Sequence, residues 1–544
     1  MNWINDYPRP QLKRDSFFSL NGEWTMNGRP LKVPFPPQSR LSGWKGDVPE
    51  TLEYSRSFTL PAGFNQPGRR VRLHFGAVDQ VAEVHVNDHS VARHEGGYLP
   101  FHADVTDVLK PGENIVSVRA IDTLSPVYPY GKQTKKRGGM WYTPVSGIWQ
   151  SVWLESVPEE PIESLKIVPD LTGITLTVFC DADTCRIEIP GEADQVVGCR
   201  KPVRIAVKNP KLWTPDNPHL YPLIVSTEAD RVESYFALRT VVISEVKGVP
   251  RVLLNGEPLF LNGVLDQGYF QDGLFLPSSP DGYEKDILRM KELGVNLLRK
   301  HIKIEPEAFY HACDRLGMLV MQDMVNSGPY SFFRDTALPT VGLIRRSDRC
   351  AHPERDLRMS FFTYHAMETV THLFNHPSII TWTIFNEGWG QFNADEHYDM
   401  IRGADPTRFI DSTSGWFHQK YSDVDSRHIY FRNKTIKRKD RPVFLSECGG
   451  YTRPIKGHQF NPQAQYGYGA TDSEEALTAK IELMWEKMVL PAVADGLCGL
   501  VYTQVSDVED EINGLYTYDR EICKVNKERM RALAERAHAI LKNI

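Results

Sequence analysis

A helix followed by a buried strand can be read in residues 362–389, FTYHAMETVTHLFNHPSIITWTIFNEGW. The helix face carries apolar residues at three- and four-residue spacing: Phe362, Ala366, Val370 and Leu373. The apolar run Ile379–Phe385 then has the length of a strand and leads directly into Asn386-Glu387. A continuously apolar strand after a helix is typical of a parallel sheet that is covered on both faces.

The same alternation of strand and helix repeats through the second half of the chain. Eight strands are expected, at Leu259–Val264, Val295–Arg299, Met318–Gln322, Ile379–Phe385, Arg408–Ser412, His428–Tyr430, Val443–Ser446 and Leu497–Val505. This number of strands, with helices between them, predicts a (β/α)8 TIM barrel over residues 245–544. An open doubly wound sheet is the alternative, but no glycine-rich phosphate loop follows any of these strands.

The first half of the chain has a different texture. Residues 1–156 show short stretches of alternating apolar residues, such as Val71, Leu73 and Phe75, separated by turn residues. This period of two without helical segments predicts a β-sandwich. A second β-rich stretch, residues 157–244, has the length of a small immunoglobulin-like sandwich. The expected fold class is therefore multidomain, with two β-sandwiches before the barrel.

Composition excludes several classes of function. The 544 residues include 63 Lys and Arg against 69 Asp and Glu, a net charge of −6. Nucleic acid is not an expected partner, because there is no basic excess to neutralise its phosphates. The first residues lack the apolar run of a signal peptide, and no later stretch is long and apolar enough to span a membrane. The eight cysteines show no CxxC spacing, so reduced thiols and a cytoplasmic location are expected.

Polar residues gather where the predicted strands end, which in a barrel is the mouth that holds the active site. Glu387 and Glu447 each follow an apolar strand, the second of these strands coming three strands after the first, so the two glutamates are expected to face one another across the mouth. Two opposed carboxylates can hydrolyse an acetal: one protonates the leaving oxygen and the other meets the anomeric carbon. The other strand-end candidates are Asp266, Gln267, Arg299, His301, Asp323, Asn386, Asp411, Tyr430, Gln504 and Asp507.

At this point the chain resembles glycoside hydrolase family 2, which includes β-galactosidases, β-glucuronidases and β-mannosidases. Residues 18–24, 96–101 and 141–149 resemble the family's jelly-roll sugar-binding domain, which identifies the first sandwich as a jelly roll. Residues 375–387 resemble the acid/base signature, and residues 442–450 the nucleophile signature.

The resemblance implies a retaining mechanism and a role for each matched residue. Glu387 is expected to be the acid/base, Glu447 the nucleophile, and Asn386 the group that binds the sugar 2-hydroxyl. Tyr430 resembles the tyrosine that holds the nucleophile, and Arg299 the arginine that keeps it ionised.

The substrate is expected to be a neutral sugar. The loop after the eighth strand carries Asp507, Glu509, Asp510 and Glu511, which would repel a uronic acid, and the family's tryptophan on that strand is replaced by Tyr502-Thr-Gln504. Asp266, Gln267, His301 and Gln504 are candidates to bind hydroxyls, and Trp416 or Trp389 to stack on the sugar. We therefore predict an exo-β-glycosidase of the β-galactosidase type.

Several alternatives stay open on the same scaffold. β-Galactofuranosidase, β-mannosidase and arabinosidase activities fit the same site, and a catalytically inactive carbohydrate-binding protein is the alternative of a different class. No cofactor is expected; no ligands for a bound Mg²⁺ or Na⁺ ion can be placed, and a homo-oligomer stays open. The irregular stretches Met324–Pro353 and Gly449–Ala470 are expected to contribute loops to the mouth of the barrel.

Overall fold

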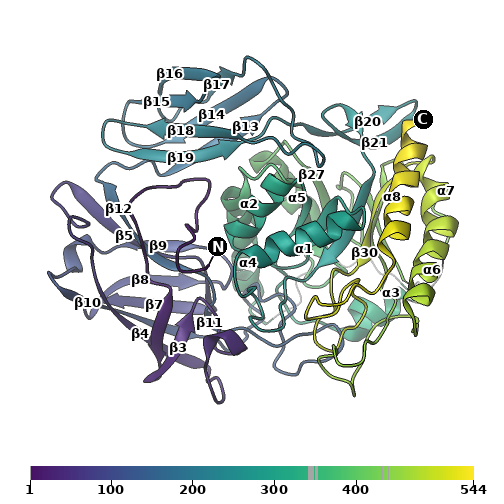
Figure 1. The fold of residues 1–544 in the computed structure, drawn as a ribbon, viewed down its shortest axis with the longest axis horizontal. Coiled ribbons are helices and arrows are strands. Elements are labelled where there is room, and N and C mark those ends of the chain that lie inside the picture. The colour runs from purple at the N-terminus through teal and green to yellow at the C-terminus, as the bar shows by residue number, and fades with distance from the viewer. Residues whose placement is uncertain are drawn as a thin grey trace.

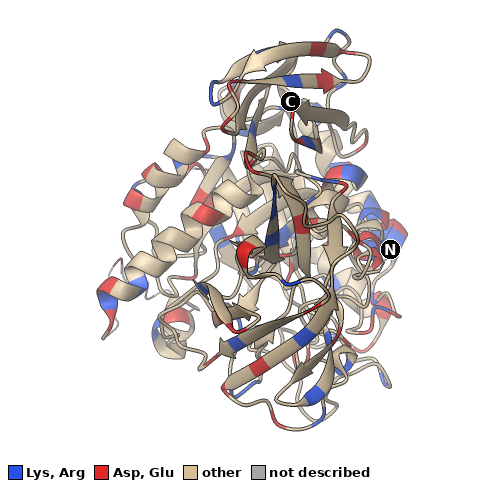
Figure 2. Ribbon diagram, turned by 90° about the vertical axis from the view of Figure 1, so that its left-hand side faces the viewer, with Lys and Arg blue, Asp and Glu red and all other residues tan. Residues whose placement is uncertain are grey.

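The protein is described here from a computed structural model that places residues 2–340, 343, 348, 353–430, 433–438 and 440–543. Two antiparallel β-sandwiches lie beside a barrel of parallel strands surrounded by helices (Figure 1). The multidomain fold class predicted from the sequence is therefore confirmed. In Figure 2 the positions of acidic and basic residues are interspersed along the ribbon.

The N-terminal sandwich has the strand arrangement of two packed sheets. One sheet has the order β1-β12-β5-β9, the other β3-β2-β4-β10-β7-β8, and β6 pairs with β11. Alternating side chains of both sheets, such as Val71 and Leu73 of β5 and Val116 and Val118 of β10, form its buried core. The strands are β1 (Phe17–Ser19), β2 (Gly22–Met26), β3 (Arg29–Val33), β4 (Thr51–Thr59), β5 (Arg69–Phe75), β6 (Val78–Asp79), β7 (Val81–Val86), β8 (His89–Glu95), β9 (Phe101–Asp104), β10 (Glu113–Ile121), β11 (Gly147–Ile148) and β12 (Val152–Pro158), with 3₁₀ turns η1 (Arg40–Ser42) and η2 (Thr106–Val108).

The second sandwich packs a three-stranded sheet, β13-β14-β17, against a four-stranded sheet, β16-β15-β18-β19. A small sheet of β20, β21 and β22 then leads into the barrel. The domain boundaries expected at 156/157 and 244/245 fall inside strands β12 and β20. The strands are β13 (Ser164–Pro169), β14 (Gly173–Phe179), β15 (Thr184–Ile189), β16 (Ala193–Gly198), β17 (Val203–Ala206), β18 (Tyr221–Ser226), β19 (Arg231–Phe236), β20 (Val241–Val246), β21 (Val249–Leu254) and β22 (Glu257–Pro258).

The barrel contains the eight parallel strands predicted from the sequence, in the order β27-β26-β25-β24-β23-β30-β29-β28. The sequence placed each of them within a few residues, and strands such as β26 and β30 are uninterrupted buried runs. The strands are β23 (Leu261–Asp266), β24 (Leu297–Lys300), β25 (Leu319–Asp323), β26 (Ile379–Asn386), β27 (Phe409–Ser414), β28 (Asp425–Ile429), β29 (Val443–Gly449) and β30 (Leu497–Thr503). The helices are α1 (Asp281–Glu292), α2 (Glu307–Leu316), α3 (Leu338–Thr340), α4 (Arg355–Leu373), α5 (Ala394–Ala404), α6 (Glu474–Met484), α7 (Leu490–Val493) and α8 (Lys527–Lys542), with π-helical turns η3 (Phe333–Ala337) and η4 (Trp485–Val489).

Side chains link the two strands that end the barrel sheet. Strands β27 and β28 are the first and last in the sheet order and do not share a backbone ladder. The Ser426 hydroxyl of β28 donates to Asp411 of β27 at 2.7 Å, and Ser414 of β27 lies 3.0 Å from the His428 ring of β28. This seam therefore brings β28 and its polar side chains to the centre of the mouth.

Among the helices described in the structure, none combines the length and the apolar character needed to cross a membrane.

Candidate active site

Glu387 lies at the end of the buried strand β26 with its backbone in the left-handed region, at φ 53°. A residue other than glycine adopts this conformation at a cost, and such positions concentrate at functional sites. Gly388 follows with φ 68°, where a Cβ atom would lie 2.1 Å from the Phe417 ring. The backbone therefore turns sharply after β26, and the Trp416 indole fixes the turn by donating to the Glu387 carbonyl at 2.9 Å.

Glu447 lies on β29 and is 5% exposed. Arg299 donates from Nη1 to Glu447 Oε1 at 3.0 Å, and the Tyr430 hydroxyl donates a short hydrogen bond to Oε2. Burial alone would raise the pKa of Glu447, but the charges of His428 and Arg299 and the Tyr430 hydrogen bond outweigh it and lower the pKa to about 2. The Glu447 carboxylate is thus held ionised in a buried position.

Arg299 of β24 is fully buried and joins three polar side chains of the site. Besides Glu447, it contacts both oxygens of Asp323 at 3.0 and 3.1 Å, and it donates from Nη2 to Asn386 Oδ1 at 2.8 Å. The resemblance implied that Arg299 keeps the nucleophile ionised, and its contact with Glu447 agrees with that role, whereas a direct contact with substrate has no support here. Its guanidinium positions Glu447 and Asn386 from behind and has no exposed surface to offer a sugar.

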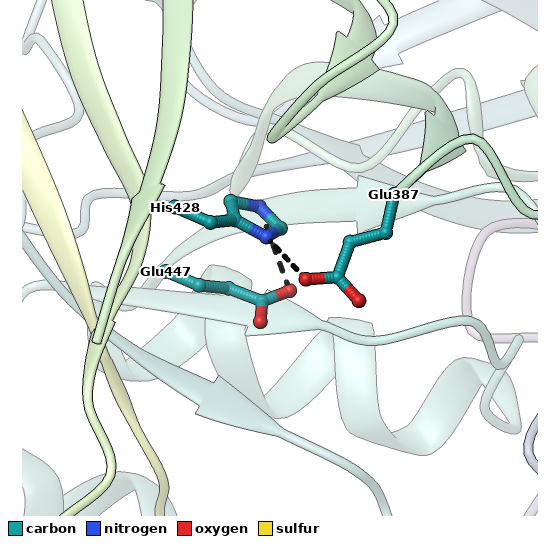
Figure 3. Close-up of side chains that lie close together, drawn as sticks. All are labelled: Glu387, His428 and Glu447. Atoms are coloured by element: carbon teal, nitrogen blue, oxygen red, sulfur yellow. Dashed lines mark hydrogen bonds and ion pairs between the residues drawn. The ribbon is translucent and has the colours of Figure 1, made fainter. Parts of the chain in front are cut away.

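His428 is a residue of the site that the sequence analysis named only as the start of an expected strand. Its Nδ1 lies 2.8 Å from Glu387 Oε1, and its Nε2 lies 3.0 Å from Ser414 Oγ and 3.7 Å from Glu447 Oε1. Figure 3 shows the imidazole bridging the two glutamates. The signal for it in the sequence was its spacing: His428 precedes Tyr430 by two residues, so both side chains point to the same side of the strand.

The remaining candidates occupy different depths of the mouth. Asn386 Oδ1 accepts a hydrogen bond from Arg299. Asn386 Nδ2 makes no hydrogen bond with any described residue, so this donor is available to a ligand. Asp266 is neutralised by Lys300 at 2.6 Å, and His301 is held by Asp323 at 2.7 Å. Burial lowers the pKa of His301 to about 4, so its ring is neutral. Gln267 is buried as well.

The sequence analysis assumed that the acidic loop after β30 presents four free charges. In the structure, three of these carboxylates, on Asp507, Glu509 and Glu511, have polar partners. Asp507 pairs with Lys524 at 2.6 Å, and Glu509 accepts two hydrogen bonds from the Thr143 backbone at 3.1 Å. Glu511 accepts a short hydrogen bond from the Tyr142 hydroxyl, and burial raises its pKa. Thr143 and Tyr142 belong to the N-terminal sandwich, so this domain fixes the loop and forms one wall of the site.

Gln504 begins that loop. Its Nε2 donates to Asn513 at 2.9 Å, and its buried Oε1 has no hydrogen-bond partner among the described residues. A buried acceptor without a partner is costly, which is consistent with a contact to a bound molecule.

Aromatic side chains line the approach to Glu387. Trp141 of the N-terminal sandwich packs on Trp389 and on Tyr330, with ring centroids 4.9 and 4.8 Å apart. In the loop after β29, Tyr468 packs on Tyr430 at 4.7 Å. The irregular stretches Met324–Pro353 and Gly449–Ala470 therefore both contribute residues to the mouth, as expected. Residues 341–342, 344–347 and 349–352 of the first stretch lie outside the described part of the chain.

Some side chains of the site are of the kinds that can bind a metal ion. One atom each of Glu387, His428 and Glu447 lie within 4.8 Å of one another, and so do atoms of His458, Asp519 and Glu521 in the loops. The first set is already joined by the His428 contacts described above. The polar contacts within this set are therefore those between the two carboxylates and the imidazole that lies between them.

Family models match most of the chain in three segments. Residues 16–158 match the glycosyl hydrolases family 2 sugar binding domain, residues 177–239 match a second model of glycosyl hydrolases family 2, and residues 245–488 match the family 2 TIM barrel domain.

Curated relatives carry two different names. A β-galactosidase of Thermoanaerobacter pseudethanolicus is 28% identical over 47% of this chain and 37% of its own length. A putative β-glucuronidase of Formosa agariphila is 26% identical over 74% of this chain and 51% of its own length. The chain therefore spans about half, or less, of the length of these relatives.

Solved structures share the fold over nearly the whole chain. A β-D-glucuronidase of Dictyoglomus thermophilum has a TM-score of 0.76 and 20% identity, with 98% of each chain covered. A β-galacturonidase of Eisenbergiella tayi has a TM-score of 0.69 and 20% identity, again with 98% of each chain covered. At this level of identity the likeness concerns the fold.

Proposed function

Because the chain belongs to glycosyl hydrolase family 2, we propose that it is a retaining exo-β-glycosidase with Glu387 as acid/base and Glu447 as nucleophile. The observation that carries the proposal is the geometry of the pair: one carboxylate oxygen of each glutamate lies within 4.8 Å of the other. Carboxyl groups about 5 Å apart are typical of retaining enzymes, whereas inverting pairs leave room for a water at roughly 6.5–9.5 Å.

The chemistry follows from the contacts of each glutamate. The ionised Glu447 attacks the anomeric carbon while Glu387 gives its proton to the departing glycosidic oxygen, which forms a covalent glycosyl ester on Glu447. Glu387 then removes a proton from a water molecule that attacks the same carbon, and the Glu447 carboxylate leaves. Asn386, anchored by Arg299, presents Nδ2 to the sugar 2-hydroxyl.

We propose a neutral sugar, with a β-galactoside first, as the substrate. Glu511 and Glu509 are acidic groups that the N-terminal sandwich holds in a buried position next to Gln504. A substrate carboxylate placed there would meet like charge in a partly desolvated site. The unpaired Gln504 Oε1 can instead accept a hydrogen bond from a hydroxyl.

A β-glucuronide is the second candidate, because the structure weakens part of the charge argument. Lys524 neutralises Asp507, and Arg137 lies 4.0 Å from Glu509. The name of the Formosa agariphila relative points to the same candidate.

The test is a screen of matched nitrophenyl glycosides with the purified protein. It includes the β-galactoside, β-glucuronide, β-mannoside, β-galactofuranoside and α-arabinoside, and proton NMR identifies the anomer released first. We expect the highest kcat/KM for a neutral β-glycoside and release of the β-anomer. A preference for the glucuronide would overturn the choice of sugar, release of the α-anomer would overturn the retaining mechanism, and failure to hydrolyse any glycoside would favour a binding protein.

A further inference from the structure

Lys132, which follows β10 in the N-terminal half of the chain, lies at the mouth of the barrel. Its segment is pinned to two barrel loops: the backbone amides of Tyr130 and Gly131 donate to the Asn326 carbonyl, after β25, at 3.0 and 3.2 Å. Gly131 has φ 69°, and a Cβ atom there would lie 2.9 Å from the Ile302 carbonyl oxygen, after β24. Glycine allows this close approach, so Lys132 is placed beside the end of β24.

The same segment lies next to the acidic loop after β30. The Tyr142 amide donates to the Lys132 carbonyl at 3.1 Å, and the Tyr142 hydroxyl reaches Glu511. The Lys132 ammonium lies 6.0 Å from the centre of the Trp141 ring, which lines the approach to Glu387. Lys132 is therefore close to the loops that follow both β24 and β30.

The Lys132 ammonium has no fixed partner of its own. It makes no hydrogen bond or ion pair with any residue that the structure describes, although its side chain is half-buried. Three other cations of the mouth have carboxylate partners within 3.0 Å: Arg299 with Asp323 and Glu447, Lys300 with Asp266, and Lys524 with Asp507. A partly buried ammonium without a partner is unfavourable, so a ligand that accepts hydrogen bonds is expected beside it.

Two hydrogen-bond acceptors lie near the ammonium. The neutral His301 ring donates through Nδ1 to Asp323 at 2.7 Å, which leaves its Nε2 as an acceptor without a partner in the described part of the chain. Glu511 is the second acceptor. Burial is the main influence on both pKa values, lowering that of His301 and raising that of Glu511, and the charge of Lys132 lowers both. This shared influence shows that the ammonium is close to each of them.

We propose that Lys132 determines specificity: its ammonium donates to one hydroxyl of the bound sugar, and Glu511 or His301 accepts the hydrogen of the same hydroxyl. A hydroxyl can accept and donate at once, whereas a substrate carboxylate can only accept and would meet the charge of Glu511. Because Asn386 faces the 2-hydroxyl, the contact is to one of the other hydroxyls. This inference rests on the proposed glycosidase function and adds to it a donor from outside the barrel.

The test removes the ammonium and one substrate hydroxyl at a time. Lys132→Met keeps most of the side-chain length without the charge, and Lys136→Met, at an exposed lysine of the same segment, is the matched control. For each protein, kcat/KM is measured with the preferred neutral nitrophenyl glycoside, with its 2-, 3-, 4- and 6-deoxy analogues and with the β-glucuronide. Binding of D-galactose and D-mannose is measured by saturation-transfer NMR, which needs no turnover.

We expect Lys132→Met to lower kcat/KM about tenfold or more for the full substrate and less than about twofold for one of the 3-, 4- and 6-deoxy analogues. The 2-deoxy analogue should lose as much as the full substrate, and Lys136→Met should change nothing. Equal losses on every analogue, or no loss, would overturn the inference, because Lys132 would then contact no hydroxyl. A loss confined to the β-glucuronide would overturn it too, since Lys132 would be binding a carboxylate.

Failure of this inference can be told apart from failure of the proposed function. Turnover by the wild type with equal losses in Lys132→Met would remove the Lys132 contact alone. Weaker sugar binding in Lys132→Met, without turnover of any glycoside by the wild type, would support the contact and overturn the glycosidase. Absence of both turnover and sugar binding in the wild type would overturn both.

Discussion

The two glutamates of the mouth have unequal surroundings, and this inequality supports the roles proposed for them. Glu447 is held by Arg299 and Tyr430, whereas within the described part of the chain only His428 hydrogen-bonds to the Glu387 carboxylate. A nucleophile must stay ionised, and an acid/base must gain and lose a proton in each cycle. The dense contacts of Glu447 suit the first task, and the single contact of Glu387 suits the second.

Substitution of each glutamate should therefore have a different signature. We expect Glu447→Ala to abolish turnover while the fold persists, because Asp323 still pairs with the buried Arg299 guanidinium. Glu387→Ala should slow substrates with poor leaving groups far more than activated aryl glycosides, since only the former need protonation. Steady-state kinetics on one substrate of each kind checks this, with circular dichroism as the control for folding. Equal losses on both kinds of substrate would contradict the acid role of Glu387.

His428 should act as a positioning residue for both glutamates. Its charge is a main cause of the low pKa of Glu447, so His428→Asn should raise that pKa. Because the nucleophile must be ionised, activity on the acid side should fall first: the ratio of kcat/KM at pH 4.5 to that at pH 7 should drop once the pKa of Glu447 approaches 4.5, by about tenfold for each further pKa unit. His311→Asn on α2 is the matched control. An unchanged pH profile in His428→Asn would show that the imidazole does not influence Glu447.

At the scale of elements, the strands were predictable and the contacts between them were not. Strands β26 and β29 begin as apolar runs, so the pattern of the sequence located both strands and the glutamates that follow these runs. The sequence analysis did not identify His428 because β28, Asp425–Ile429, is short and largely polar. The position of the His428 ring also depends on its contact with Ser414 of β27. Likewise, the Asp507–Lys524 pair joins residues 17 positions apart through a loop that has no regular pattern.

Helix α2 begins with a carboxyl group that destabilises the fold at high pH. The pKa of Glu307 is about 7 in the folded protein against an ordinary value of 4.5, so the folded state binds more protons between these values. Stability should therefore be fully present below about pH 4.5 and decrease as the pH rises through 7. Glu307→Gln should raise the free energy of unfolding by about 1–2 kcal/mol at pH 8. This is a net value, because the substitution also removes a favourable negative charge from the start of the helix. Thermal unfolding at pH 4.5 and 8 measures this.

The control for that variant is Glu474→Gln, at the exposed first position of α6. It should not become more stable at pH 8. An equal gain in both variants would mean that the effect comes from the helix start in general and does not come from the burial of Glu307.

At the scale of the whole molecule, the site is built from two domains. The barrel supplies the carboxylates, and the N-terminal sandwich supplies Trp141, Tyr142 and Thr143 to its wall. The sequence showed the Trp141–Trp149 segment as a family motif but did not show that Tyr142 reaches Glu511, which is 369 positions away in the chain. Such contacts depend on how the domains pack, and a single sequence carries no periodic signal for that.

The interdomain contact should matter for binding more than for chemistry. Tyr142→Phe removes the hydroxyl that donates to Glu511 and frees this end of the loop after β30. Since a hydrogen bond to a charged group contributes about 1.5–3 kcal/mol, we expect KM to rise roughly tenfold or more while kcat changes little. Kinetics with the preferred glycoside gives both constants; Tyr128→Phe on the same domain is the control. A fall in kcat with an unchanged KM would place Tyr142 in the chemical step instead.

The attachment of the acidic loop to Tyr142 and Thr143 also has an evolutionary consequence. Under the proposed function, the position of the loop groups at the sugar can change through substitutions in a domain that carries neither Glu387 nor Glu447, so substrate preference can drift while the proposed reaction is preserved. Grafting the segment around these two residues from one relative onto another would exchange sugar preference without any alteration of the barrel. Relatives with one architecture and different substrates could diverge along this route.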